Sequence, residues 1–414
     1  MLNKVRHSRY AGHNNFALGI AAFSFLTLVL LTSTEVFSRF GFSPKIWIII
    51  YAISIIFISI DRKQIFQIIN HSWPVFLLPV FALVSTLWSE VPERSMYASL
   101  QLLITTLIAV WIAVRFSAVN IFTSLMLATA VGVLASLANN YLHFIDTTPK
   151  EIYVGMEITY TGIYNQKNVF GKVIDLLVLS MIVVGIRFNK LSLAVFVCVL
   201  LWIPLSWSKS AGSILIYLIT MIIPFYWWLS RNSKNQFVLF LFLLVMLLSS
   251  LLLVLLLDLD LVNDLLLAVG KDSTLTGRTQ LWSSGLDVFS QYPILGVGYQ
   301  AFWVPGAFEE VQKIHSMFLG QPINGFHNAY IEVLVALGLF GFSIFILLLV
   351  STLFRSLNWY MEKPSAESLG VLFFVISTIV AMMFDVIVFR QHEIFYMLII
   401  IIYIMAGKQL TKQV

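Results

Sequence analysis

Apolar residues run through this chain in long unbroken blocks, separated by polar intervals that are mostly short. A helix needs roughly 20 apolar residues to cross a bilayer, and about twelve runs approach that length. Lipid offers the backbone no hydrogen-bond partner, so a spanning segment must satisfy its own N–H and C=O groups, as a helix does. The predicted helices cover residues 16–33, 46–60, 73–88, 97–114, 120–138, 169–186, 191–207, 212–229, 236–257, 328–350, 366–384 and 392–406.

Two polar intervals are long, and the charge of the short ones indicates how the chain is oriented. The long intervals run from about Asn139 to Asn168 and from about Asp258 to Phe326. If the N-terminus is inside, the short inside segments hold about fourteen Lys and Arg residues and the short outside loops about five. Because cytoplasmic loops carry the excess of positive charge, both termini are predicted to be cytoplasmic and both long intervals extracytoplasmic.

The second long interval contains a helical pattern of its own. Its apolar positions are Trp282, Leu286, Val288 and Phe289, and its candidate N-caps are Ser273, Thr274 and Thr276. Tyr292-Pro293 then ends this helix. We expect a small extracytoplasmic subdomain with one amphipathic helix at the membrane face. The predicted division is residues 1–257 with nine helices, 258–326 as the loop subdomain and 327–414 with three helices.

Composition supports the membrane assignment and excludes several kinds of site. Of the 414 residues, 59% are hydrophobic and 11% charged, against roughly 45–50% and about 25% in soluble domains. The net charge of +5 fits basic cytoplasmic loops, so no nucleic-acid partner is expected. The single cysteine, Cys198, excludes an intrachain disulfide, and no Gly-rich Lys-Ser/Thr loop indicates ATP hydrolysis. Asp258-Leu259-Asp260 is interpreted as a solvated helix end, so no metal site is expected.

The first candidate for chemistry is Arg278, in Thr276-Gly277-Arg278-Thr279 of the long interval. A guanidinium binds phosphate through two parallel hydrogen bonds, and the neighbouring glycine lets an anion approach the backbone. The alternative is a solvated loop arginine beside a capping threonine.

The second candidate is His327, in Gly325-Phe326-His327-Asn328, where the long interval meets the next apolar run. An imidazole at the membrane interface can accept a proton from a sugar hydroxyl near neutral pH, and Asn328 can fix its orientation. The alternative is a structural histidine at a helix start.

Other polar groups gather on the same side of the predicted bundle. Lys209 lies in a turn between Ser206 and Ser213, which is either a phosphate-binding turn or an ordinary polar connection. Ionisable residues within an apolar helix are costly in lipid, which favours a polar cavity near the helix start at 167 and near the last helix. The ionisable residues concerned are Lys167, Lys172, Asp175, Asp385, Arg390, His392 and Glu393, and Asn168 is a polar candidate beside Lys167. Trp282, Trp303 and Tyr299 are candidate stacking platforms for sugars.

Several of these motifs, in this order and spacing, resemble the C-terminal signature of the O-antigen ligase and polymerase family. They are residues 274–282, 292–299, 327–330 and 337–341. Residues 161–168 and 208–210 resemble upstream motifs of the same family. The Thr-Gly-Arg-Thr form is most similar to the exopolysaccharide-polymerase branch.

The resemblance implies a GT-C-like membrane glycosyltransferase in the bacterial inner membrane, with its active site facing the periplasm. The implied donor is a glycan on undecaprenyl diphosphate, and the acceptor is a lipid-linked repeat unit or a lipid A core. No cofactor is implied; chain-length regulator and flippase proteins are the implied partners. The mechanism is displacement with inversion, in which His327 orients or deprotonates the acceptor hydroxyl. Cationic groups hold the diphosphate, namely Arg278, Lys209, Lys167 and Arg390.

Two details remain open at this stage. Lys209 stands where the family motif carries an arginine, and lysine keeps the charge but loses the bidentate fork. A different class of protein, a flippase without chemistry, would need charged residues along a path through the bilayer midplane. The cationic residues gather at one face instead, which favours an enzyme.

Overall fold

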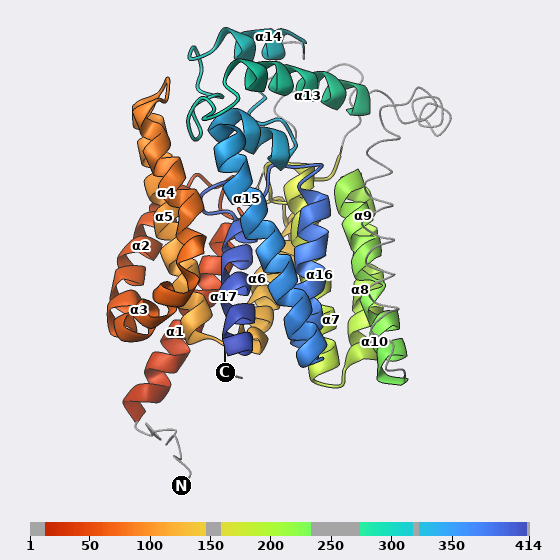
Figure 1. Cartoon of the computed structure of the whole chain (residues 1–414). Coiled ribbons are helices and arrows are strands. Elements are labelled where there is room, and N and C mark those ends of the chain that lie inside the picture. The colour runs from red at the N-terminus through yellow and green to blue at the C-terminus, as the bar shows by residue number, and fades with distance from the viewer. Residues whose placement is uncertain (1–12, 146–158, 233–273, 318–322, 412–414) are drawn as a thin grey trace.

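A computed structural model describes residues 13–145, 159–232, 274–317 and 323–411, and every regular element in these ranges is helical (Figure 1). Before the first long interval the helices are α1 (His13–Ser33), α2 (Ser43–Ile60), α3 (Arg62–Ser72), η1 (Trp73–Phe76), α4 (Leu77–Val84), η2 (Ser85–Leu87), α5 (Pro92–Arg115) and α6 (Ala118–Leu142). After it come α7 (Lys167–Arg187), α8 (Leu191–Ser208), α9 (Ala211–Thr220), α10 (Ile223–Asn232), α13 (Thr274–Gln291), α14 (Glu309–Met317), α15 (Ala329–Glu362), α16 (Ala366–Ala381) and α17 (Ile394–Thr411).

The prediction of a polytopic α-helical membrane protein is confirmed. In the described part of the chain, 8 helical stretches are long and apolar enough to cross a membrane. Shorter apolar helices cover Leu18–Ser33, Ala366–Ala381 and Ile394–Lys408. The predicted helix at 236–257 lies outside the described residues, so the number of about twelve stays a prediction.

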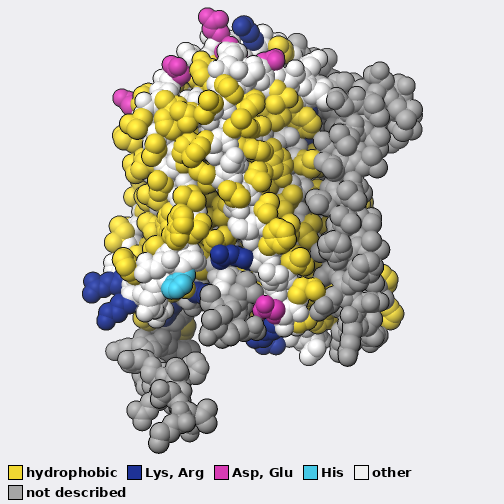
Figure 2. All heavy atoms as spheres, in the orientation of Figure 1, with side chains coloured by type: hydrophobic (Ala, Val, Ile, Leu, Met, Phe, Trp, Pro, Cys, Tyr) yellow, Lys and Arg dark blue, Asp and Glu magenta, His cyan; other side chains and the backbone are white. Residues whose placement is uncertain are grey.

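The flank of the helix bundle is the surface that faces lipid. Large apolar side chains are exposed there on several helices, among them Ile48, Leu134 and Leu347. Figure 2 shows hydrophobic side chains covering the described flank between two more polar ends. In water this exposed apolar area would be unfavourable, and in lipid it is the ordinary condition of a membrane helix.

Positive side chains lie at the end of the bundle where α1 begins and α17 ends (Figures 1 and 2). There Arg115 pairs with Asp61 at 3.6 Å, and the Lys408 ammonium donates to the carbonyl of Ala113 at 2.8 Å. Arg187, the last residue of α7, pairs with a carboxylate near the start of α16. This is the end that the charge pattern predicts to be cytoplasmic.

The long helix α15 is broken at Gly338, which adopts φ 62° and ψ −166°. The segment after α13 fills the break: the backbone amides of Leu339 and Phe340 donate to the carbonyls of Pro293 and Ile294. A break in a membrane helix is tolerated when neighbouring groups satisfy the freed backbone. A Cβ at position 338 would meet the Ile294 carbonyl, so the close approach requires glycine.

The pairing continues on the other side of the break, where the amides of Val297 and Gly298 donate to the carbonyls of Val335 and Ala336 at 3.0 and 2.9 Å. Two stretches that the sequence presents as separate motifs, residues 292–299 and 337–341, therefore form one structural unit at the start of α15.

At the end of the bundle opposite the termini, α13 and α14 lie across the tops of the long helices (Figure 1). An apolar cluster of their own joins them to the start of α15; it comprises Leu281, Val288, Val297, Phe302, Phe308, Val311, Ile314, Phe326, Ile331 and Val335. The helix expected around Trp282 is present as α13 and ends before Tyr292-Pro293, as predicted. The backbone of α13 is already helical at Thr274, so Thr276 lies inside the helix, and Ser273 is outside the described residues. The division at residues 257 and 326 stays a prediction.

Candidate functional site

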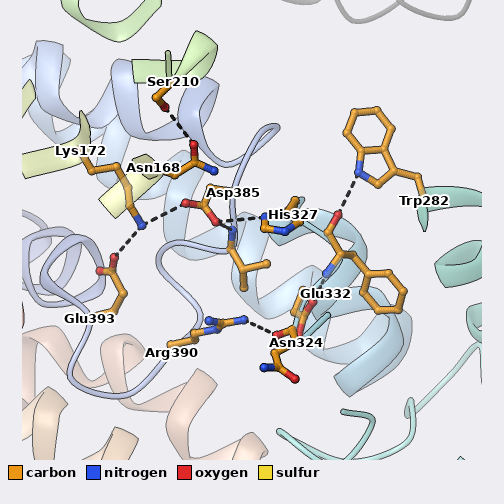
Figure 3. A network of polar contacts seen from close by, with 12 residues as sticks. Asn168, Lys172, Ser210, Trp282, Asn324, His327, Glu332, Asp385, Arg390 and Glu393 are labelled. Carbon is orange, nitrogen blue, oxygen red and sulfur yellow. Dashed lines mark hydrogen bonds and ion pairs between the residues drawn. The ribbon is translucent and has the colours of Figure 1, made fainter. Parts of the chain in front are cut away.

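A polar site forms where residues of four segments far apart in the sequence come together, and Figure 3 shows those of α7, the turn before α15 and the loop between α16 and α17. Lys172 comes from the second turn of α7, Arg278 from α13 and His327 from the turn before α15. Asp385 and Glu393 come from the loop between α16 and α17. A cluster of ionisable groups thus lies at the end of the bundle opposite Arg115, Arg187 and Lys408.

Lys172 lies at the centre of this cluster. Its ammonium is 3.1 Å from Oδ2 of Asp385 and 3.8 Å from Oε1 of Glu393. Burial would raise the pKa of Asp385, but Lys172 and His327 together outweigh burial and hold that pKa below its usual range. Burial raises the pKa of Glu393 to about 7, although Lys172 opposes this. Asp385 is therefore a fixed anion, and Glu393 is poised to change its protonation near neutral pH.

His327 points toward Asp385 (Figure 3). Its Nδ1 is 3.8 Å from Oδ1 of Asp385, within ion-pair range but longer than a hydrogen bond, and this buried nitrogen has no hydrogen-bond partner among the described residues. The backbone of His327 is left-handed, at φ 50°. Asn328 is the N-cap of α15, and its Oδ1 accepts from the amides of Tyr330 and Ile331 at 3.0 and 3.2 Å. Asn328, which was expected to orient His327, thus uses its side-chain oxygen in capping.

A buried carboxylate holds the turn that carries His327. Glu332, 6% exposed, accepts through Oε2 from the Phe326 amide and through Oε1 from Trp303 Nε1, both at 3.0 Å. On the other side, Nη2 of Arg390 donates to the carbonyl of Asn324 at 2.8 Å (Figure 3). The positive charge of Arg390 also acts on the Glu332 carboxylate. The turn is therefore fixed at two residues before His327, namely Asn324 and Phe326.

The two tryptophans proposed as sugar platforms belong to the apolar cluster. Nε1 of Trp282 donates to the carbonyl of Phe326 at 3.0 Å. The Trp303 ring packs 4.9 Å from the ring of Phe302 and 4.8 Å from that of Phe326. Neither tryptophan is among the residues that line the cavity described next. The structure gives both a packing role beside the site.

A cavity opens beside the charged cluster, and the space in it, including the part that is open to solvent, is about 460 Å³. It is lined by Asn168, Lys172, Asp175, Ser210, Gly212, Ser213, Ile216, Arg278, Ser377, Ala381, Phe384, Asp385 and Phe395. Oγ of Ser210 donates to Oδ1 of Asn168 at 3.0 Å and joins α9 to α7. Burial lowers the pKa of Arg278 while Asp385 opposes the shift, and an arginine keeps its charge in such a site. The cavity therefore presents one guanidinium and one ammonium at its charged end.

The other predicted cations lie around this cavity and do not line it. Lys209 is exposed at the C-cap of α8, in a left-handed conformation, one residue before Ser210 of the lining. Lys167 is the first residue of α7 and precedes Asn168. Arg390 is engaged with the turn before α15. Of the predicted cations, Arg278 is the one that reaches the cavity.

His392 lies apart from the cluster. Its ring stacks on Trp47 with centroids 4.0 Å apart and hydrogen-bonds the Tyr51 hydroxyl. Burial lowers its pKa to about 4, so it is neutral at neutral pH.

Three residues that the structure makes central had no assigned role among the candidates chosen from the sequence, and one of them, Glu332, was not a candidate at all. Lys172 and Asp385 are visible in the sequence as costly charges near helix ends, but nothing there shows that they pair. Glu332 lies five positions after His327 in an apolar helix, where an ionisable residue is itself a signal of a site.

Comparisons with known proteins agree with the resemblance drawn from the motifs. Residues 194–346 match the family model described as O-antigen ligase, a range that includes Arg278 and His327. The chain is 25% identical over 366 residues, 86% of this chain and 79% of the other, to exopolysaccharide production protein ExoQ of Rhizobium meliloti (strain 1021). These similarities confirm the family resemblance.

Proposed function

We propose that this O-antigen ligase-like membrane protein transfers a glycan from undecaprenyl diphosphate to an acceptor sugar, polymerising the lipid-linked repeat units of an exopolysaccharide. The observation that carries the proposal is the meeting of Arg278, Lys172 and Asp385 at one cavity, with His327 beside Asp385. The similarity to an exopolysaccharide production protein supports the choice of product.

The cationic end of the cavity suits a diphosphate leaving group. As the bond from the anomeric carbon to the phosphate oxygen breaks, the electron pair stays on the diphosphate and negative charge grows there. Arg278 and Lys172 are placed to stabilise that charge, and fixed charges in a poorly solvated site act strongly. Lys172 already faces two carboxylates, so the guanidinium of Arg278 supplies the greater part of the stabilisation of the diphosphate.

His327 is the candidate base for the acceptor. With Nδ1 directed at Asp385, the other ring nitrogen is left for an acceptor hydroxyl. The hydroxyl proton passes to the imidazole as the new oxygen–carbon bond forms, and Asp385 stabilises the resulting imidazolium. Attack opposite the leaving diphosphate inverts the anomeric carbon. No nucleotide is required, because the lipid diphosphate bond supplies the energy.

The proposed setting is the bacterial inner membrane, with the site facing the periplasm. The site lies at the end of the bundle opposite Arg115, Arg187 and Lys408, which fits a cytoplasmic location for those basic residues. A flippase delivers such lipid-linked units to that face, and chain-length regulators are the partners we expect there.

The matched family model, described as O-antigen ligase, favours a second candidate, attachment of the glycan to a lipid A core. Deleting the gene separates the two. Retention of single repeats with loss of chain length indicates a polymerase. Loss of the glycan from lipid A core indicates a ligase.

Substitutions of His327 test the chemistry in the purified protein with a lipid-linked donor. A general base contributes on the order of 10²–10⁴ in rate, so His327→Ala should lose that much at normal membrane expression. His327→Gln keeps a hydrogen-bonding side chain but takes no proton, and should be nearly as slow if His327 is the base. His71→Ala, an exposed histidine on α3 away from the site, is the matched control and should react at the wild-type rate. Wild-type transfer rates in both His327 variants would show that His327 is not the general base.

A further inference from the structure

The start of α7 carries a polar stripe that runs into the bundle. Asn168, Lys172 and Asp175 follow one another at spacings of four and three, which places them on one helix face, and all three line the cavity. The stripe extends about 10 Å along the helix axis, at about 1.5 Å per residue. The next turn, with Val178 and Leu179, is buried and apolar, so Asp175 is the inner end of the stripe.

Asp175 is buried without a full set of partners. Its side chain is 5% exposed, and its Oδ1 has no hydrogen-bond partner in the part of the chain that the structure describes. An unsatisfied carboxylate oxygen inside a membrane helix is costly, and such residues ordinarily mark a ligand site. The mechanism proposed above makes no use of it.

The walls around Asp175 combine hydroxyls with aromatic rings. Ser210 and Ser213 of α9 are linked by a hydrogen bond of 3.3 Å and line the same cavity. Phe384 and Phe395 line it as well. A few convergent polar groups set against apolar rings are typical of small-molecule sites. A sugar ring matches this lining, because its edge carries hydroxyls and its faces carry C–H groups.

We propose that Asp175 accepts a hydrogen bond from a hydroxyl of the donor sugar, the one attached directly to the lipid diphosphate. This inference rests on the proposed function, because Arg278 and Lys172 fix where the diphosphate lies in the same cavity. Asp175 is one helical turn beyond Lys172, about 4.5 Å along the axis. A sugar joined to a diphosphate at Lys172 is thereby brought within reach of the carboxylate.

Two probes separate recognition of the sugar from recognition of the diphosphate. Binding of undecaprenyl diphosphate is compared with binding of the lipid-linked repeat unit extracted from a strain that lacks this protein, both to the purified full-length chain. Asp175→Leu removes every acceptor at similar volume and should weaken binding of the repeat unit about ten- to hundredfold. Asp175→Asn keeps one acceptor oxygen and should lie between Leu and wild type. Binding of undecaprenyl diphosphate should be unchanged in both variants.

Asp287→Asn provides the matched control, since Asp287 is exposed on α13 and the change of chemistry is the same. Equal weakening of both probes by the Asp175 variants, together with a lower melting temperature, would show a structural carboxylate and overturn the subsite. Wild-type affinities in both variants would overturn it too. Failure of the wild-type protein to bind either probe would count against the proposed function itself, and so differs from the outcomes that overturn only the sugar subsite at Asp175.

Discussion

Glu332 provides a sensitive test of whether His327 is held in place for catalysis. The carboxylate is 6% exposed and accepts two hydrogen bonds of 3.0 Å, from the Phe326 amide and from Trp303 Nε1. The first of these fixes the residue directly before His327. We therefore interpret Glu332 as a positioning residue that acts through the turn and does not touch substrate.

The expected loss of rate follows from the hydrogen-bond donors that each substitution leaves unpaired. Glu332→Ala strands two buried donors at about 1–3 kcal/mol each, and also removes the anion opposite Arg390. Glu332→Gln keeps one acceptor oxygen and strands one donor. A displacement of about 1 Å at a catalytic group costs roughly 10²-fold in rate. We expect kcat to fall about tenfold in the Gln variant and about 10²-fold in the Ala variant, at unchanged KM for the lipid-linked donor.

A double-mutant cycle with His327 distinguishes positioning from general damage. If Glu332 acts through His327, adding Glu332→Ala to His327→Ala should cost nothing further in rate. The measurement is steady-state transfer by purified protein, with melting temperature recorded for every variant. Glu367→Gln, on α16 at the far end of the bundle, is the control carboxylate and should leave kcat unchanged. Losses that multiply in the double mutant would refute the positioning role.

Two further predictions concern the donor site and the topology. Arg278→Lys keeps the charge but loses the bidentate fork, so transfer should fall at normal protein levels, and Arg278→Ala should be slower still; wild-type glycan from the Ala variant would remove Arg278 from the site. In a Cys198→Ser background, a membrane-impermeant thiol reagent should label Glu309→Cys in intact cells and Lys363→Cys, at the other end of α15, after permeabilisation alone. The reverse pattern would overturn the orientation.

Local pattern predicted most of the long apolar helices, because the length of an apolar run and the need to satisfy the backbone in lipid are properties of each segment by itself. The helix around Trp282 could likewise be predicted from its own residues. The amphipathic helix α3 was not among those predicted. The break at Gly338 could not be predicted in this way, because the groups that satisfy it lie at Pro293 and Ile294, on a segment far away along the chain. An apolar run that contains a glycine gives no sign in the sequence of whether another segment packs into the helix at that glycine.

The candidate site likewise contains residues that the sequence could identify and contacts that it could not. Arg278 and His327 were identified by their residue types and positions, and the structure brings both to one cluster. Trp282 and Trp303 were selected because aromatic rings stack on sugars, yet rings also fill apolar clusters, and these two pack around Phe326. The pairing of Lys172 with Asp385 joins residues more than two hundred positions apart, which no spacing within a single sequence reveals.

The distribution of charge along the helices also bears on the choice between an enzyme and a transporter. Between Asp175 and Arg187, α7 carries no ionisable acid or base, and the same holds for α15 between Glu332 and Arg355. α16 likewise carries none after Glu367. A transport path for a diphosphate would need polar groups through the midplane, because an unpaired charge there is expensive. Charges are confined to the two ends of these helices, and Arg278, Lys172 and the candidate base His327 lie together at one end, which fits a reaction carried out at the membrane surface.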